Sequence, residues 1–185
     1  MILTYSSSEM FSFIEENWKI FMIDQIKRCK IISEFDFQAA FYNLIINKIE
    51  EVSDDTWRIY NMYYLRRKKM YPDLLLFQNN LPIICIEFKN YLFQEQSDKK
   101  IQIDVSKLNN IFKAYPDTMK YGISINLLKR PIKFNIKKGI YGKKIHIFNL
   151  IINELPDLIN NWNEILKELE ISHNNIEKAR KSLLS

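Results

Sequence analysis

Apolar residues near the start of the chain recur every three to four positions, which is the spacing of one helix face. Within residues 9–32 these positions predict one or two helices. Ser33 then follows as a candidate N-cap, with Asp36 three residues later in a capping-box pattern. A second amphipathic helix is therefore predicted over residues 34–50. Its apolar stripe contains Phe37, Ala40, Phe41, Leu44 and Ile45.

The next part of the chain changes to short apolar runs of the kind that form strands. Residues 57–64 are rich in aromatic side chains, and two further apolar runs cover residues 73–77 and 83–88. The polar, proline-containing stretch 78–82 separates these two runs and is typical of a turn. The two runs together predict a β-hairpin.

Beyond the hairpin, the pattern alternates between helix and strand. Apolar residues spaced by three and four predict a helix over residues 98–114. Strands are expected near residues 121–128 and 144–150, with residues 132–136 as a further candidate strand. One or two helices are expected after residue 153.

This order of elements predicts an α/β fold with a mixed central β-sheet flanked by helices. The 185 residues fit one domain, and no repeat or linker divides them. We expect a single domain over residues 1–185, with its core at about 33–150. Helical additions are expected at about 9–32 and 153–184.

Positive charge is unevenly distributed along the chain. The net charge is +5, but residues 118–153 contain eight basic residues and no Asp or Glu. A segregated basic segment is typical of proteins that bind a phosphate backbone, although a solvated surface that keeps the protein soluble is an alternative. The candidate contacts to nucleic acid are Arg66, Arg67, Lys68, Lys69, Lys129, Arg130, Lys133, Lys137 and Lys138.

Several classes of protein do not fit the sequence. Two cysteines are too few for a disulfide scaffold, and neither His146 nor His173 has the spacing of a zinc site. There is no glycine-rich phosphate loop, no apolar run long enough to span a membrane and no signal-peptide pattern at the N-terminus. We therefore expect a cytoplasmic protein that does not insert in membranes.

The predicted hairpin carries the residues that are best suited to chemistry. Asp73 begins one run, and Glu87 and Lys89 lie fourteen and sixteen residues later at the end of the other. Because side chains alternate along a strand, Glu87 and Lys89 point to one face and Phe88 to the other. A carboxylate at the end of a buried strand is costly without a partner. Two carboxylates at one end of a hairpin could hold Mg²⁺, which prefers oxygen ligands.

The helix predicted over residues 34–50 adds a third acidic residue. At 100° per residue, Glu34 lies on the same face as Phe37 and Phe41. A glutamate on the core-facing stripe could reach a metal at the sheet edge. Gln38 lies at the border of this face and is a candidate contact to nucleic acid.

In these residues the chain resembles the PD-(D/E)XK, or restriction-endonuclease-like, nucleases. The resemblance covers residues 33–128, from Glu34 through the Pro72-Asp73 pair and the Glu87-x-Lys89 triplet to the helix and strand that follow. The polar positions Gln102, Asp104 and Lys107 are loosely similar to those of some members.

The resemblance implies a restriction-endonuclease-like core and a nuclease that requires Mg²⁺, with Mn²⁺ as a substitute. Asp73 and Glu87 would bind the metal ion, and Glu34 would support the ion or its water. Lys89 would orient or activate the attacking water and stabilise charge on the phosphate. The expected substrate is DNA, and cutting both of its strands with one site per chain would favour a homodimer.

Two other functions remain open from the sequence. The chain could be a catalytically inactive nucleic-acid-binding or assembly module on the same fold, or a structural protein in which Glu87 and Lys89 form an ordinary ion pair. Metal-dependent cleavage distinguishes the first reading from the others, and salt-dependent binding distinguishes the second from the third.

Overall fold

The computed structural model describes residues 5–28, 33–52, 55–65, 70–91, 95–133 and 135–152, together with Lys167, Ile171, Asn174, Asn175 and Lys178. The regular elements, in chain order, are α1 (Ser7–Lys27), α2 (Glu34–Glu51), β1 (Trp57–Asn61), β2 (Leu74–Gln78), β3 (Leu81–Asn90), α3 (Asp98–Ala114), β4 (Tyr121–Leu128), the short 3₁₀ helix η1 (Gly142–Lys144) and β5 (Ile145–Ile151).

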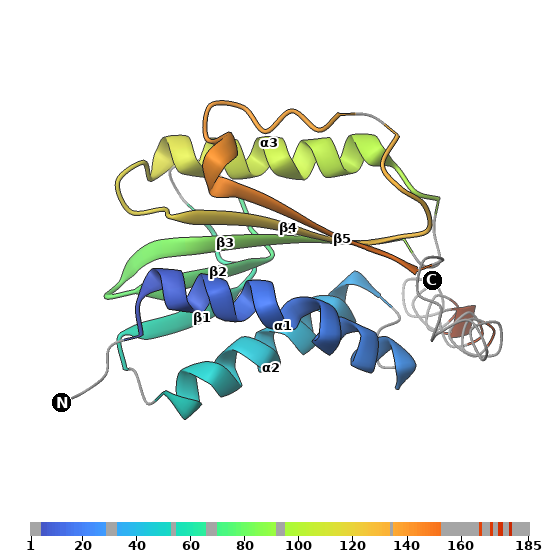
Figure 1. Cartoon of the computed structure of the whole chain (residues 1–185), viewed down its shortest axis with the longest axis horizontal. Helices are drawn as coiled ribbons and strands as arrows, with labels where there is room; N and C mark the ends of the chain where they lie inside the picture. Colours follow the sequence, from blue (N-terminus) through green and yellow to red (C-terminus); the bar gives the residue numbers. More distant parts are fainter. Residues whose placement is uncertain are drawn as a thin grey trace.

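A five-stranded mixed sheet forms the centre of the protein, with the strands in the order β1-β2-β3-β4-β5. The pairs β1–β2 and β2–β3 are antiparallel, whereas β3–β4 and β4–β5 are parallel. Helices cover both faces, with α1 and α2 on one side and α3 on the other (Figure 1). The α/β class and the mixed, helix-flanked sheet expected from the sequence are confirmed.

Alternation along β3 divides its side chains between the two helical layers. Ile84, Ile86 and Phe88 belong to the apolar cluster beneath α1 and α2, whereas Cys85 belongs to the cluster beneath α3. Phe88 packs against the rings of Phe37 and Phe41 on α2, with centroids 4.7 and 5.4 Å away. Glu87, which lies two residues after Cys85, therefore also faces α3.

The predicted hairpin is present, and its connection is tighter than the five-residue turn expected. Asn79 and Asn80 have φ angles of 51° and 62°, which place both in the left-handed region. Two consecutive residues of this kind form the two-residue hairpin turn whose twist matches that of the strands. Asparagine tolerates the left-handed region better than most residues, which explains the Asn-Asn pair.

Helix α2 begins where the capping box predicts. The Ser33 side chain accepts a hydrogen bond from the Asp36 amide, and the Asp36 carboxylate accepts one from the Ser33 amide at 2.7 Å. These bonds satisfy amide groups that have no partner within the helix. They also fix Glu34 as the first residue of the helix.

The first strand is shorter than the predicted run 57–64. β1 ends at Asn61, because Met62 has a φ of 49° and its amide donates a hydrogen bond to the Asp73 carbonyl at 3.0 Å. The chain leaves the sheet at this point, and further on the Leu65 amide donates a hydrogen bond of 2.9 Å to the Met70 carbonyl. The aromatic residues Tyr63 and Tyr64 therefore lie outside the sheet.

One other expectation needs correction. The candidate strand at 132–136 is absent in the four of its residues that the structure describes, because the backbone after β4 makes its hydrogen bonds with α3 side chains instead. Helix α1 is an integral part of the core, since its buried residues share one apolar cluster with Phe37 and Phe41. The helices predicted over 153–184 lie outside the described residues, apart from the five single positions given above.

Candidate active site

Asp73 lies directly before β2 and is hydrogen-bonded to the neighbouring strand β3. One of its carboxylate oxygens, Oδ2, accepts a hydrogen bond of 2.7 Å from the backbone amide of Phe88. Phe88 is the residue between Glu87 and Lys89. The structure therefore brings the two acidic residues Asp73 and Glu87 to the same end of the β2–β3 hairpin.

Glu87 is a carboxylate buried on the α3 side of the sheet, with 1% of its surface exposed. Its Oε2 lies 2.7 Å from the Lys107 ammonium of α3. Its Oε1 is buried and has no hydrogen bond from any residue that the structure describes. Burial and the nearby Asp73 carboxylate raise the pKa of Glu87 well above its usual value, although Lys107 opposes this rise.

Lys89 joins the two helical layers. Its ammonium lies 3.2 Å from a carboxylate oxygen of Glu34 on α2 and 3.2 Å from one of Asp104 on α3. Burial acts to lower the pKa of Lys89, but the carboxylates of Asp104 and Glu34 outweigh it and raise the pKa. Lys89 is therefore held in its charged form. Glu34 forms an ion pair with Lys89, so Glu34 is placed to position the lysine.

Asp104 and Lys107 also belong to the cluster, although the sequence indicated them only as polar positions loosely similar to those of some nucleases. Both lie on one flank of α3, at the edge of its apolar stripe, and project toward the end of β3. Asp104 is 6% exposed; burial raises its pKa to about 6, and the ion pair with Lys89 limits the rise. The signal that could have identified it is an acidic residue within an apolar stripe, the same signal that selected Glu34.

A row of small polar side chains extends the site across the sheet. In the parallel register, Ser124 is the partner of Glu87, and Asn126 is the partner of Lys89. Both are fully buried, and the Asn126 amide donates a hydrogen bond of 3.0 Å to the Asn149 side chain on β5. Polar residues on the α3 face of β4 therefore adjoin the charged residues of β3.

The charges at this end of the hairpin do not balance. Four carboxylates, from Glu34, Asp73, Glu87 and Asp104, surround two ammonium groups, from Lys89 and Lys107. Among the described residues the cluster therefore carries two uncompensated negative charges when all groups are ionised. An excess of negative charge in a partly buried site attracts a cation.

Two carboxylates of the cluster offer oxygen atoms of the kind that Mg²⁺ prefers. No group of three Asp, Glu, His or Cys side chains in the described part of the chain is arranged to hold a metal ion. Mg²⁺ does not require such a group, because it commonly binds one or two carboxylates and retains several waters or phosphate oxygens. The buried Oε1 of Glu87 and the carboxylate of Asp73 could supply these two protein ligands.

Among the described residues, the other predicted site residues form no ion pair or hydrogen bond with this cluster that the structure shows. Gln38 is 3% exposed, so the folded chain leaves almost none of its surface for a contact to nucleic acid. The basic run 66–69 lies outside the described residues. Lys129, Lys133 and Lys137 are exposed, whereas Arg130 forms a 3.2 Å ion pair with Asp98.

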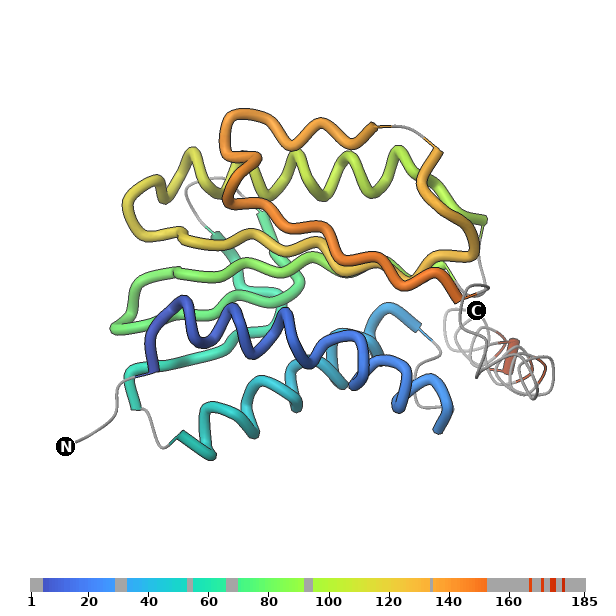
Figure 2. Tube along the Cα trace, viewed as in Figure 1, coloured from blue at the N-terminus to red at the C-terminus, as the bar shows by residue number. Residues whose placement is uncertain are grey.

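Within the acid-free segment (residues 118–153), residues 135–140 run along one side of α3 (Figure 2). The backbone carbonyls of Lys137 and Lys138 accept hydrogen bonds from Gln102 and Asn109. At 100° per residue, these two polar residues lie on the flank of α3 opposite to Lys107. Helix α3 therefore separates Lys137 and Lys138 of the acid-free segment from the carboxylate cluster.

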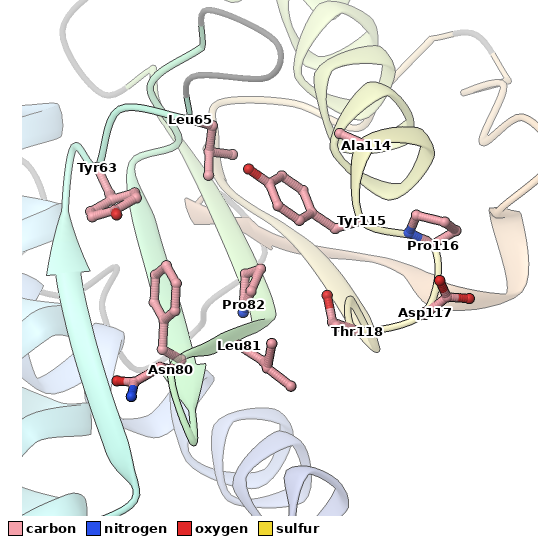
Figure 3. Close-up of a pocket in the computed structure, with 11 residues that line it drawn as sticks. Tyr63, Leu65, Asn80, Leu81, Pro82, Ala114, Tyr115, Pro116, Asp117 and Thr118 are labelled. Atoms are coloured by element: carbon pink, nitrogen blue, oxygen red, sulfur yellow. The ribbon is translucent and has the colours of Figure 1, made fainter.

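An open pocket of about 340 Å³ lies elsewhere, at the turn end of the β2–β3 hairpin (Figure 3). Tyr63, Leu65 and Tyr115 line it on one side, and Leu81 and Pro82 line it on the other. None of the four clustered carboxylates lines this pocket. We therefore regard it as separate from the candidate site.

Comparison with known proteins identifies no relative. No protein-family model, no curated protein and no solved structure matches the chain. None of the helices in the described ranges is long and apolar enough to cross a membrane. The function must therefore be inferred from the chemistry of the site.

Proposed function

We propose that this protein is a Mg²⁺-dependent endonuclease that hydrolyses phosphodiester bonds of nucleic acid, with DNA as the expected substrate, on a restriction-endonuclease-like core. The observation that carries the proposal is the excess of carboxylates over ammonium groups around a buried, unpaired oxygen of Glu87. A divalent cation would supply the missing positive charge. The phosphate backbone of a nucleic acid is a polyanion that such an ion can bridge to the protein.

Asp73 and Glu87 are the residues that would hold the ion. The Phe88 amide and the Lys107 ammonium each engage one oxygen of these carboxylates, and so restrain their orientation. When bound, Mg²⁺ polarises a water molecule and a phosphoryl oxygen, which hydrolysis at neutral pH requires.

Lys89 would stabilise the negative charge that develops on the phosphate. Because its neighbours raise its pKa, it stays protonated at neutral pH and is unsuited to removing a proton from water. The ion pairs with Glu34 and Asp104 hold its ammonium in one position before the substrate binds. A preorganised charge of this kind acts without reorganisation during the reaction.

The exposed lysines of the acid-free segment are proposed to bind the substrate backbone. Lys129, Lys133 and Lys137 project from the segment that follows β4. Their contacts would supply affinity that does not depend on base sequence.

The ion pair between Lys107 and Glu87 favours one alternative, a catalytically inactive nucleic-acid-binding module. At 2.7 Å, Lys107 partly neutralises Glu87 without any metal ion. Such a module would bind nucleic acid equally well in Mg²⁺ and in EDTA and would cleave none.

The deciding experiment is to incubate the protein with supercoiled plasmid, single-stranded DNA and RNA, each with Mg²⁺, Mn²⁺ or EDTA. We expect cleavage with either metal and none with EDTA, and loss of cleavage in Asp73→Asn. Absence of metal-dependent cleavage of every substrate would contradict the proposal, and tight binding in the same samples would favour the inactive module.

A further inference from the structure

Two exposed tyrosines lie beside the candidate site and have no role in the chemistry proposed above. Tyr64 and Tyr71 are 41% and 53% exposed, and their ring centroids are 4.8 Å apart at an interplanar angle of 32°. Adjacent exposed aromatic rings form a contiguous apolar patch of the kind that marks an interaction site. This pair therefore provides an aromatic surface that the fold itself does not bury.

The backbone of Tyr71 is connected directly to the carboxylate cluster. The Lys107 ammonium donates to the Tyr71 carbonyl at 2.6 Å and to Oε2 of Glu87 at 2.7 Å. Tyr71 also lies two residues before Asp73, with the buried Pro72 between them. The aromatic pair is thus held next to the two carboxylates proposed to bind the metal ion.

An exposed ring on a residue whose backbone contacts a phosphate-binding site suits a nucleotide base. A base is joined to its phosphate through a single sugar. A base beside the reacting phosphate can therefore reach the protein surface next to Asp73 and Glu87. In a duplex, both faces of a base are covered by its neighbours, whereas an unpaired base can stack on a protein ring. The ion pair between Lys107 and Glu87 adjoins the Tyr71 carbonyl, and charged groups of this kind disfavour a dry interface with another protein.

We propose that Tyr64 and Tyr71 form a stacking platform for an unpaired base, so that the substrate is single-stranded nucleic acid or a single-stranded segment of a larger one. This inference rests on the proposed nuclease function, because it places the base next to the phosphate at Asp73 and Glu87. It restricts the substrate class of that site. DNA and RNA share the required chemistry, since both present unpaired bases.

The test measures binding in EDTA and cleavage in Mg²⁺ with single-stranded DNA, single-stranded RNA and duplex DNA of one sequence. We expect wild type to bind a single strand more tightly than the duplex. Replacing both tyrosines (Tyr64→Ala with Tyr71→Ala) should weaken single-strand binding roughly ten- to a hundredfold and leave duplex binding unchanged. Comparison of the DNA and RNA strands shows which of them the site accepts.

Two matched variants control for loss of structure and for loss of any surface tyrosine. Tyr71→Phe keeps the ring and should bind as wild type does. Tyr60→Ala removes a tyrosine of similar exposure, 42%, from β1, where its ring contacts Tyr63 and Phe77, and should also bind as wild type does. Circular dichroism checks that each variant is folded.

Three results would overturn the platform. Equal or tighter binding of the duplex by wild type is one, and unchanged single-strand binding by the double alanine variant is another. Conversion of an oligomer to a monomer by that variant, with unchanged nucleic-acid binding, would show that the tyrosines contact a second copy of the chain.

Metal-dependent cleavage in any of these cases would leave the nuclease function intact. Absence of cleavage by wild type would instead remove that function.

Discussion

The Lys107 ammonium lies 2.7 Å from Oε2 of Glu87, although Glu87 is 1% exposed and the two residues belong to different elements. This ion pair ties α3 to the end of β3. Lys107 is also the counterion that lowers the free-energy cost of burying the Glu87 carboxylate in the absence of a metal ion.

Replacement of Lys107 by Met should destabilise the protein by about 3 to 5 kcal/mol, because it leaves the Glu87 carboxylate buried without a counterion. Urea denaturation at neutral pH measures this loss. Mg²⁺ should raise the midpoint of the variant more than that of wild type, since it supplies the missing charge. The double variant with Glu87→Gln should recover much of the stability and lose the response to Mg²⁺. Equal responses of wild type and Lys107→Met to Mg²⁺ would argue against metal binding at Glu87.

Asp104 predicts a specific dependence of stability on pH. Its pKa rises from 3.8 in the unfolded chain to about 6 in the folded protein, so the folded state binds this proton more tightly. The stabilisation is fully present below pH 4 and is lost as the pH rises through 6. It amounts to about 3 kcal/mol at most, from 1.36 kcal/mol per pKa unit.

Asp104→Asn has no such proton to bind. The free energy of unfolding of wild type minus that of this variant should therefore increase as the pH falls from 7 to 4. Denaturation of both proteins across this range measures the difference. A constant difference would show that Asp104 does not titrate in this interval.

Asp73→Asn and Lys89→Ala should separate metal binding from turnover. The first change removes a ligand charge, so Mg²⁺ affinity by calorimetry and the rate of cleavage should fall together. The second removes no ligand and should retain Mg²⁺ binding. Its rate should fall about a hundred- to a thousandfold, because a preorganised transition-state charge is worth roughly 3 to 4 kcal/mol.

Lys99→Ala, which removes an exposed lysine near the start of α3, is the matched control and should cleave as wild type does. An unchanged rate in Lys89→Ala would exclude this lysine from the reaction. Nucleic-acid binding in EDTA should survive both substitutions, because its main contacts lie elsewhere.

The exposed lysines of the acid-free segment should govern the salt dependence of binding. Joint replacement of Lys133 and Lys137 by Ala should weaken binding to all sequences alike and reduce the slope of log affinity against log salt by about 2, at close to one unit per phosphate contact. Joint replacement of the exposed α1 lysines Lys19 and Lys27 removes the same charge from the opposite side of the sheet. If both double variants behave alike, the acid-free segment contributes only general positive charge.

Local sequence patterns predicted most of the fold because its elements follow simple periodicities. Helix α3 and β4 begin and end where their apolar spacing indicates, and the Ser33 capping box marks the start of α2. Prediction failed for Tyr63 and Tyr64, whose strand-like composition is overridden by the left-handed Met62 and its bond to the Asp73 carbonyl. That bond joins residues distant in the sequence, so no local pattern reveals it.

The site was partly predictable for a similar reason. Alternation along β3 correctly separates Glu87 from Phe88, and the helical angle places Glu34 toward the core. Asp104 and Lys107 were not chosen, because their importance depends on which strand lies beneath α3. The excess of carboxylates is visible only when residues from four separate parts of the chain are brought together.

Lys89 forms ion pairs with helices on opposite faces of the sheet. Its position therefore depends on how both helices are placed against the sheet. A small slide of α2 against the sheet moves Glu34, and a slide of α3 moves Asp104, so either motion pulls the ammonium from its place. Substitutions in the distant α1–α2 core, which do not touch the cluster, can then reduce turnover without unfolding the chain. In such variants, the proposed nuclease activity should be lost on heating at a lower temperature than secondary structure, because the ion pairs of Lys89 with α2 and α3 should break before the helices and strands unfold.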